Sequence, residues 1–190
     1  MALRRQEGRQ SSDMKRRPGG CELRVSARSR SATRGWICMG PLVLPCALGR
    51  SGRSVRKREG DGATPSGAWR LVQVLYRADR VQRPQTVLPV RRLKTDDGWC
   101  DAVGNGNYNR WVRLPYPASA ERLWRADALY DLVVVLDHNH RPRIQGAGSA
   151  IFIHVARPGC QPTEGCVALA LRHLLMLLAM VRRHAPLVIA

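Results

Sequence analysis

The chain has few aromatic and few acidic residues, and it has no long apolar run. Aromatic side chains make up 5% of its 190 residues, with a single Phe, so Val, Leu and Ala must supply most of the core. The longest apolar run, residues 174–181, is much shorter than the ~20 residues that a membrane-spanning helix needs. We therefore expect no transmembrane segment.

The chain also lacks a CxxC pair and a secretory signal. Its six cysteines are dispersed, which argues against a structural zinc site and against a disulfide scaffold. A secretory signal needs roughly 7–15 apolar residues after a basic start, and residues 1–35 contain no such stretch. We expect a cytoplasmic protein as the sequence stands, and a periplasmic one if the start is misassigned.

Positive charge is abundant. Lys and Arg number 32 against 14 acidic residues, which gives a net charge of +18. Such a surface favours anionic partners such as nucleic acid, an acidic membrane face or a cell-wall polymer. An arginine-rich surface that is merely solvated is an equally open interpretation. No helix-turn-helix, zinc finger or aromatic platform accompanies the charge, so we expect no specific nucleic-acid partner, and nucleic-acid binding is the weakest functional hypothesis.

The apolar pattern predicts a mainly β domain closed by one helix. Alternation and runs of β-branched residues predict strands at residues 22–28, 40–48, 68–76, 86–90, 129–136 and 147–155. Prolines within 40–48 favour an edge strand there. A period of 3.6 residues predicts a helix at 170–184, with Arg182 and Arg183 in its last turn.

The remaining segments are predicted to lack regular structure. Residues 1–21 are expected to form a basic, disordered extension, and residues 22–190 a single domain. Within that domain, 49–67 is expected to be a charged loop, and 77–106 to be mainly loop apart from the strand near 86–90.

Residues 148–169 contain the side chains that point to chemistry. A predicted strand ends in His154, a loop with Pro and Gly follows, and Thr163-Glu-Gly-Cys166 lies just before the predicted helix. A cysteine attacks a carbonyl as its thiolate, so a neighbouring imidazole has to accept the proton. Gly165 allows a sharp bend that exposes N–H groups to an oxyanion, and a nearby helix start would favour negative charge. We therefore expect a nucleophilic cysteine whose thiol pKa lies below the ordinary value of about 8.5.

Residue types alone leave other interpretations open. A cysteine is more often a packing residue than a nucleophile, and a histidine at a strand end is usually a satisfied polar group. Cys160 and Cys166 form a C-x5-C pair that would suit a disulfide or a redox site. Residues 137–140, Asp-His-Asn-His, resemble part of a metal cluster, but no third ligand stands at a persuasive spacing, so a turn is favoured and no metal is expected.

The segment that contains Thr163-Glu-Gly-Cys166 resembles the active-site motif of the L,D-transpeptidase (YkuD-type) catalytic domain. EGDGATPSGAW at 59–69 is similar to the turn before a strand in that family, and DGWCD at 97–101, YNR at 108–110 and GSAIF at 148–152 resemble a compact branch of it. The resemblance covers residues 24–183. It implies one β-sandwich or barrel domain with long loops and a C-terminal helix.

The resemblance also implies roles for individual residues. Cys166 matches the nucleophile and His154 the base, which a main-chain carbonyl, that of Val155 or a neighbour, would orient. Gly165 matches the glycine whose surroundings form the oxyanion pocket, and Thr163 matches the hydroxyl residue of the motif. No cofactor is implied. Relatives suggest further substrate contacts, for which the candidates here are Glu164, Arg157, Trp99, Tyr108, Asn109 and Asn139; packing or loop roles remain open for the last four.

Three departures from the family pattern concern substrate choice. Glu164 stands where the family has His, eight residues rather than a longer loop separate His154 from Thr163, and Ala168 stands where many members have Arg. Arg157 or Arg172 would be the substitute anchor for an anionic group of the substrate.

By resemblance, the substrate is the tetrapeptide stem of peptidoglycan or a muropeptide, and the chain is an acyltransferase that works through a Cys166 acyl-enzyme. The alternative is an L,D-carboxypeptidase of cytoplasmic peptidoglycan recycling. The sequence does not decide between these two, and it does not indicate the oligomeric state.

Overall fold

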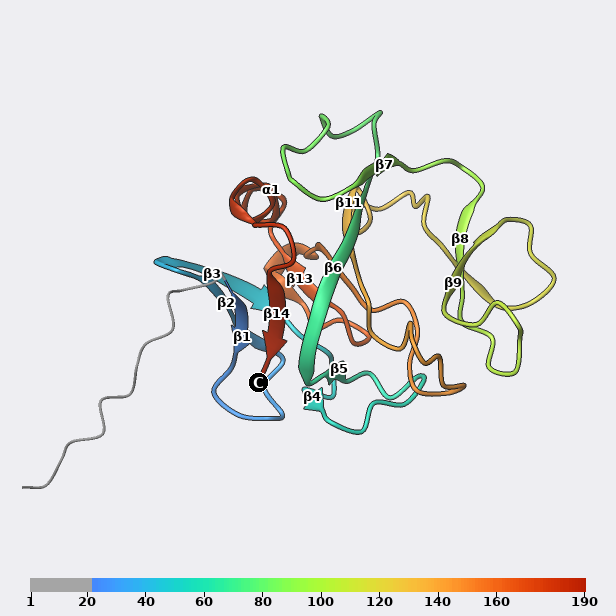
Figure 1. Ribbon diagram of the computed structural model, residues 1–190, viewed down its shortest axis with the longest axis horizontal. Helices are drawn as coiled ribbons and strands as arrows, with labels where there is room; N and C mark the ends of the chain where they lie inside the picture. The colour runs from blue at the N-terminus through green and yellow to red at the C-terminus, as the bar shows by residue number, and fades with distance from the viewer. Residues whose placement is uncertain (1–21) are drawn as a thin grey trace, which may run out of the picture.

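Strands and the loops that join them dominate the computed structural model, which describes residues 22–190 (Figure 1). The predicted extension at 1–21 lies outside the described residues. The strands are β1 Leu23–Ser26, β2 Arg34–Met39, β3 Leu42–Ala47, β4 Arg53–Ser54, β5 Thr64–Pro65, β6 Gly67–Tyr76, β7 Val90–Arg92, β8 Asp97–Cys100, β9 Arg110–Arg113, β10 Ala120–Arg122, β11 Leu132–Leu136, β12 Phe152–Val155, β13 Val167–Leu169 and β14 Pro186–Ile189. One α-helix, α1 Leu171–Met180, and a 3-10 turn at Pro158–Cys160 complete these elements.

The main sheet closes on itself. Its strand order is β11-β12-β13-β3-β2-β1-β14-β6-β7, and β11 also pairs with β6. Two smaller sheets, β10-β8-β9 and β4-β5, lie outside this ladder. The prediction of a single, mainly β barrel or sandwich domain with long loops and a C-terminal helix is therefore confirmed.

Two apolar clusters lie on opposite faces of the central strands. Side chains alternate between the faces of a strand, so Ile153 and Val155 of β12 join one cluster while Phe152 joins the other. The first cluster includes Leu174, Leu177 and Leu178 of α1. The second includes Cys166 and residues from β8 and the segment after β10. Figure 1 shows α1 and the β8–β9 hairpin on different sides of the main sheet.

Several predicted elements differ from the structure. The helix ends at Met180 rather than 184, so Arg182 and Arg183 lie beyond it, and β14 follows. Strand β14 pairs with β1 and β6 and buries Leu187 and Ile189 between them. Burial of these apolar side chains stabilises the strand, and a longer helix would leave them out of the sheet. Strands β2, β8, β9, β10 and β13 were also missed, and the one expected near 86–90 lies at Val90–Arg92. The segment 49–67, predicted to be a charged loop, contains the paired short strands β4 and β5.

The segment at 40–48 is not an edge strand, because β3 lies between β2 and β13. Its proline at position 45 is tolerated because β13 pairs with β3 only at Ala47, two residues further on.

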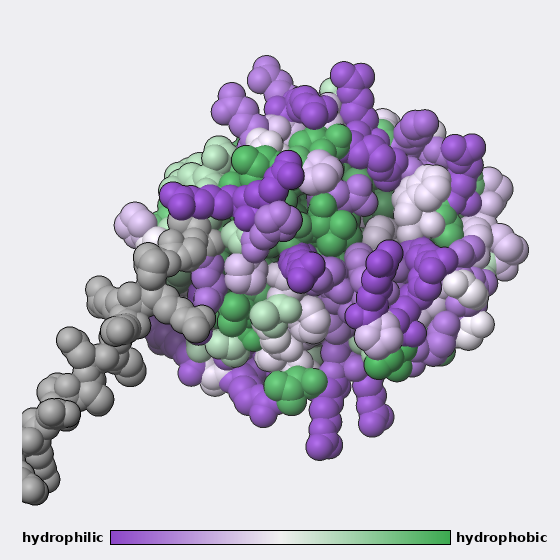
Figure 2. Space-filling model, in the orientation of Figure 1, coloured by the Kyte–Doolittle hydropathy of each residue, from purple (hydrophilic) through white to green (hydrophobic). Residues whose placement is uncertain are grey.

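The surface is polar on the face seen in Figure 2, where hydrophilic side chains surround small apolar patches. No helix within residues 22–190 is long and apolar enough to cross a membrane.

Candidate active site

His154 lies on a central strand of the main sheet. It belongs to β12, between β11 and β13, where it pairs with Val133 on one side and with Ala168 on the other. Its side chain is buried, and Nδ1 lies 2.9 Å from the carbonyl oxygen of Val155. A carbonyl only accepts hydrogen bonds, so Nδ1 carries the proton and Nε2 is left with a free lone pair. The ring is therefore held in the tautomer that a base requires.

Cys166 precedes β13 and lies beside Phe152. The parallel register pairs Ile153 with Val167, which places Cys166 opposite Phe152. The thiol donates to the carbonyl of Ala150 at 3.2 Å, and Sγ lies 3.4 Å from the N–H of Phe152. Because side chains alternate along a strand, the thiol and the imidazole two positions after Phe152 point to the same face of the sheet. Both line one cavity of about 500 Å³.

The cavity is rich in charged groups. Its basic side chains are Lys57, Arg125 and Arg157, and its acidic ones are Glu59, Asp101, Glu121 and Glu164. Sequence analysis singled out only two of these seven, Arg157 and Glu164. Glu59 and Asp101 lie in two segments that carry the family resemblance but were given no role, and no local pattern marked Lys57, Arg125 or Glu121.

The thiol and the imidazole are both neutral at physiological pH. Burial, followed by the negative charge of Glu121, raises the pKa of Cys166 to about 12, against opposing effects of the Phe152 N–H and the Lys57 charge. Burial also lowers the pKa of His154 to about 4, although its bond to the Val155 carbonyl acts in the opposite direction. The prediction of an unusually acidic thiol is therefore wrong, because desolvation of the thiolate outweighs its nearby hydrogen-bond donors.

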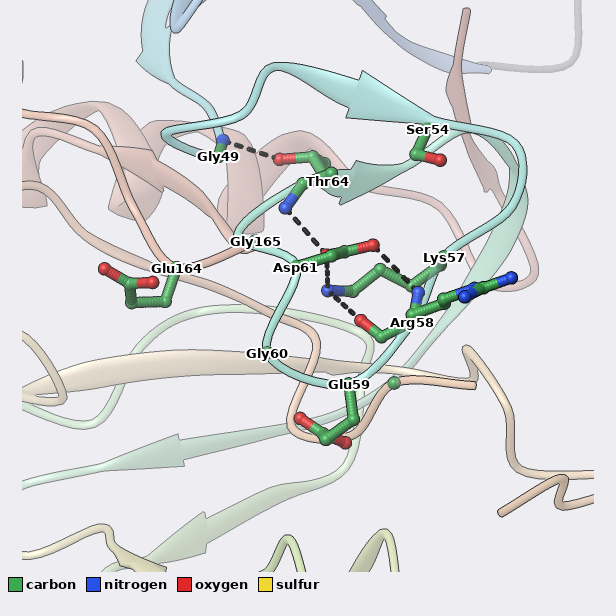
Figure 3. Close-up of polar contacts among 12 residues, drawn as sticks. Gly49, Ser54, Lys57, Arg58, Glu59, Gly60, Asp61, Thr64, Glu164 and Gly165 are labelled. Carbon is green, nitrogen blue, oxygen red and sulfur yellow. Dashed lines mark hydrogen bonds and ion pairs between the residues drawn. The ribbon is translucent and has the colours of Figure 1, made fainter. Parts of the chain in front are cut away.

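Two threonine hydroxyls hold the backbone of the nucleophile. Thr163 Oγ1 donates to the carbonyl of Cys166 at 2.7 Å, and Thr64 Oγ1 donates to the same carbonyl at 3.2 Å. The N–H of Gly49 in turn donates to Thr64 Oγ1 at 2.8 Å (Figure 3). Thr64 was given no role from the sequence, but it lies in the segment 59–69 that resembles the turn before a strand in the family.

Gly165 has a conformation and surroundings that suit glycine alone. Its φ is +132°, and a Cβ at this position would lie 2.9 Å from the carbonyl oxygen of Ala63. Its N–H lies 3.2 Å from Thr163 Oγ1. This N–H is therefore occupied within the loop, so Gly165 shapes the turn rather than offering its own N–H to an oxyanion.

The helix does not contribute to the nucleophile as predicted. Strand β13 separates Cys166 from Leu171, the first residue of α1, and the helix packs on the opposite face of the sheet. Arg172 lies on this helix and does not line the cavity, whereas Arg157 does.

Glu164 lies at the mouth of the cavity. Its carboxylate pairs with Arg50 at 2.7 Å and its side chain is 81% exposed. In Figure 3 it points away from Lys57 and Asp61.

Among residues 22–190, Trp99, Tyr108, Asn109 and Asn139 are not part of the lining of this cavity, and their role as substrate contacts stays a prediction. Their polar atoms hold the loop before β12. Asn109 Oδ1 accepts from the Trp99 indole at 2.9 Å and from the N–H of Ala150 at 3.2 Å. Asn139 Nδ2 donates to the carbonyl of Gly148, and the N–H of Gly148 donates to the Tyr108 hydroxyl. These four residues therefore fix the segment that presents the Ala150 carbonyl to the thiol.

The structure also places the residues of two other hypotheses about this region. Cys160 and Cys166 are both free thiols and form no disulfide. His138 Nε2 lies 2.9 Å from the carbonyl oxygen of Ala147, as expected for a loop residue. In the described part of the chain, no three His, Cys, Asp or Glu side chains are arranged to hold a metal ion.

A partly buried pair, which no sequence pattern indicated, lies beside the reacting groups. The Tyr130 hydroxyl donates to Glu121, and the Tyr130 ring meets the His154 ring edge to face at 5.4 Å between centroids. Glu121 belongs to β10, one of the strands that the sequence pattern did not predict.

We compared the chain with curated proteins, solved structures and protein-family models. Neither the curated proteins nor the solved structures include a match to this chain. The family model of the L,D-transpeptidase catalytic domain, YkuD, matches residues 29–189, which is nearly the whole chain. The chain therefore belongs to the YkuD L,D-transpeptidase catalytic domain family, a family of enzymes whose domain implies a peptidoglycan substrate.

Proposed function

We propose that the protein is a cysteine-dependent acyltransferase of the L,D-transpeptidase type, acting on the tetrapeptide stem of peptidoglycan. One observation carries the proposal: the Cys166 thiol and the His154 imidazole lie on the same face of the main sheet and line one cavity. Membership of the family supports the substrate class.

The neutral state of the pair determines how the nucleophile is formed. Nε2 of His154 accepts the thiol proton as sulfur attacks the carbonyl at the L-centre of the third residue of the stem. A carbon–sulfur bond forms, and the peptide carbon–nitrogen bond breaks as the imidazolium returns its proton to the departing D-alanine amine. The thiolate arises only during attack, because burial disfavours it in the free enzyme.

The acceptor decides the product. An amine of a second stem yields a cross-link and a transpeptidase, whereas water yields a shortened stem and an L,D-carboxypeptidase. In both reactions His154 takes a proton from the acceptor as it attacks the thioester, and the thiol is regenerated. The same two residues therefore serve both outcomes.

Arg157 is our candidate for the group that binds a substrate carboxylate. It lines the cavity and is exposed, so its guanidinium is accessible to a bidentate carboxylate. Position 168, where many relatives have Arg, is an alanine that also lines the cavity.

Incubation with a purified disaccharide-tetrapeptide, followed by mass spectrometry, tests the proposal. We expect loss of one alanine, with a dimer if an amine is the acceptor and without one if water is. Cys166→Ala should abolish both products and remain folded, because a buried thiol is replaced by a slightly smaller apolar group. Cys160→Ala is the matched control in the same loop and should stay active. Full activity of Cys166→Ala would rule out the acyl-enzyme.

A further inference from the structure

A buried lysine lies next to the nucleophile, and the mechanism above does not use it. Lys57 belongs to the loop between β4 and β5, and its side chain is only 5% exposed. Its ammonium donates to the carboxylate of Asp61 and, at 3.0 Å, to the carbonyl of Arg58 (Figure 3). Among residues 22–190 these are its two hydrogen-bond partners, so one of its three N–H donors is left without one.

The lysine packs against glycines that flank the site on two sides. A Cβ on Gly148 would lie 2.8 Å from Lys57 Cγ, and a Cβ on Gly165 would lie 3.3 Å from Lys57 Nζ. The ammonium is therefore beside the residue that precedes Cys166, and it lines the same cavity as the thiol. A Cβ at Gly148 would clash with the carbon chain of Lys57, and one at Gly165 would be in tight contact with its ammonium.

Asp61 holds the ammonium in this position. Its Oδ2 accepts from the N–H of Arg58 and its Oδ1 from the N–H of Ala63, both at 2.8 Å. Each carboxylate oxygen is thus bound to the backbone of the same short loop, so the carboxylate that pairs with Lys57 is itself fixed.

A positive charge at this point would favour the reaction. Proton transfer from a neutral thiol to a neutral imidazole separates charge in a buried site, and Glu121 adds a negative charge nearby. Positions 164 and 168, on either side of the nucleophile, are Glu and Ala, and neither supplies a cation.

We propose that Lys57 is the fixed cation of this active site, which stabilises the negative charge that develops on Cys166 Sγ and on the attacked carbonyl oxygen. Its pairing with Asp61 keeps the ammonium in place before the reaction begins, as electrostatic stabilisation of a transition state requires. This inference rests on the proposed function for its role in turnover, but the effect of Lys57 on the thiol can be measured without any substrate.

Alkylation of Cys166 by iodoacetamide, followed by mass spectrometry of the peptide that contains it, provides that measurement over a series of pH values. In Lys57→Met the thiolate loses the positive charge of Lys57, so the alkylation rate should fall about tenfold at each pH below the pKa of the thiol, as a change of one pKa unit would produce. Lys57→Arg keeps the charge and should recover part of the rate. Arg58→Met removes an exposed charge from the same loop and should leave the rate unchanged.

Turnover and thermal unfolding separate this role from a structural one. We expect kcat to fall in Lys57→Met at least as much as alkylation does, while the folded fraction is retained. An alkylation profile equal to that of the unchanged protein would overturn the inference, including when Lys57→Met unfolds at a lower temperature. If the disaccharide-tetrapeptide is not a substrate of the unchanged protein, the proposed function fails, and alkylation still decides whether Lys57 stabilises the thiolate.

Discussion

At the scale of single residues, desolvation determines the chemistry. The imidazole of His154 and the thiol of Cys166 are both buried, and each is neutral for that reason. A buried neutral imidazole is already in the form that accepts a proton. The buried thiolate, in contrast, is unfavourable and has to form during attack. A nearby cation such as Lys57 would lower the free energy of forming it.

The buried imidazole also makes stability depend on pH. In the folded protein the pKa of His154 is lowered from 6.5 to about 4, so the unfolded chain binds a proton that the folded one does not. The free energy of unfolding should therefore fall as pH drops from 6.5 towards 4, by about 3 kcal/mol from this group. Urea titrations over this range provide the measurement. His154→Gln should show a smaller loss, and an equal loss in both proteins would contradict the assignment.

At the scale of elements, the loop between β12 and β13 places the nucleophile. Parallel pairing of the two strands brings Cys166 beside Phe152, and the Thr163 hydroxyl closes the turn by bridging the Gly165 N–H and the Cys166 carbonyl. The second hydroxyl, from Thr64, anchors the same carbonyl from β5. The position of the thiol thus depends on the β12–β13 loop and on β5.

Removal of the Thr163 hydroxyl should impair turnover more than folding. In Thr163→Val the shape is kept, but a buried N–H and a buried carbonyl lose a partner, at about 1–3 kcal/mol of unfolding free energy. We expect kcat to fall by about tenfold or more, because small misplacements of a reacting group are costly. Thr163→Ser keeps the hydroxyl and should retain most of the activity. The disaccharide-tetrapeptide assay compares the two, and equal activity would show that the hydroxyl does not position the nucleophile.

At the scale of the whole molecule, the two faces of the main sheet have different roles: one packs against the helix, and the other carries the cavity. One apolar cluster contains α1 and the side chains of β12 and β13 that face it, while the other contains Phe152 and Cys166. Alternation along two short strands sends neighbouring residues to different clusters. The helix therefore supports the sheet from the face that does not carry the cavity.

Truncation of a buried side chain of α1 should consequently lower the stability of the protein and leave catalysis intact. Leu178 is fully buried against the sheet, so Leu178→Ala should lower the free energy of unfolding by about 2–5 kcal/mol. Met176 is 47% exposed on the same helix, so Met176→Ala should change it by less than about 0.5 kcal/mol. Chemical denaturation measures both. The kcat of folded Leu178→Ala should equal that of the unchanged protein, and a selective loss of kcat would show that the helix does act on the site.

The sequence by itself determined the local part of this protein. Runs of apolar and β-branched residues predicted strands at 129–136 and 147–155, which contain the observed Leu132–Leu136 and Phe152–Val155. The resemblance of His154 and Thr163-Glu-Gly-Cys166 to an active-site motif indicated the family that the family model then showed. Both signals are local, because burial of one face and a short active-site loop leave their pattern in consecutive residues.

Only the tertiary structure decided which distant groups surround the thiol and how they change its chemistry. Thr64 meets the Cys166 carbonyl although the two residues are 102 positions apart, and Lys57 and Glu121 reach the same cavity from unrelated loops and strands. The short strands β13 and β14 form because neighbouring strands bury them, not because their own sequence demands it. Ionisation follows the same rule: a pKa depends on how much water the folded chain removes, and no local pattern contains that quantity.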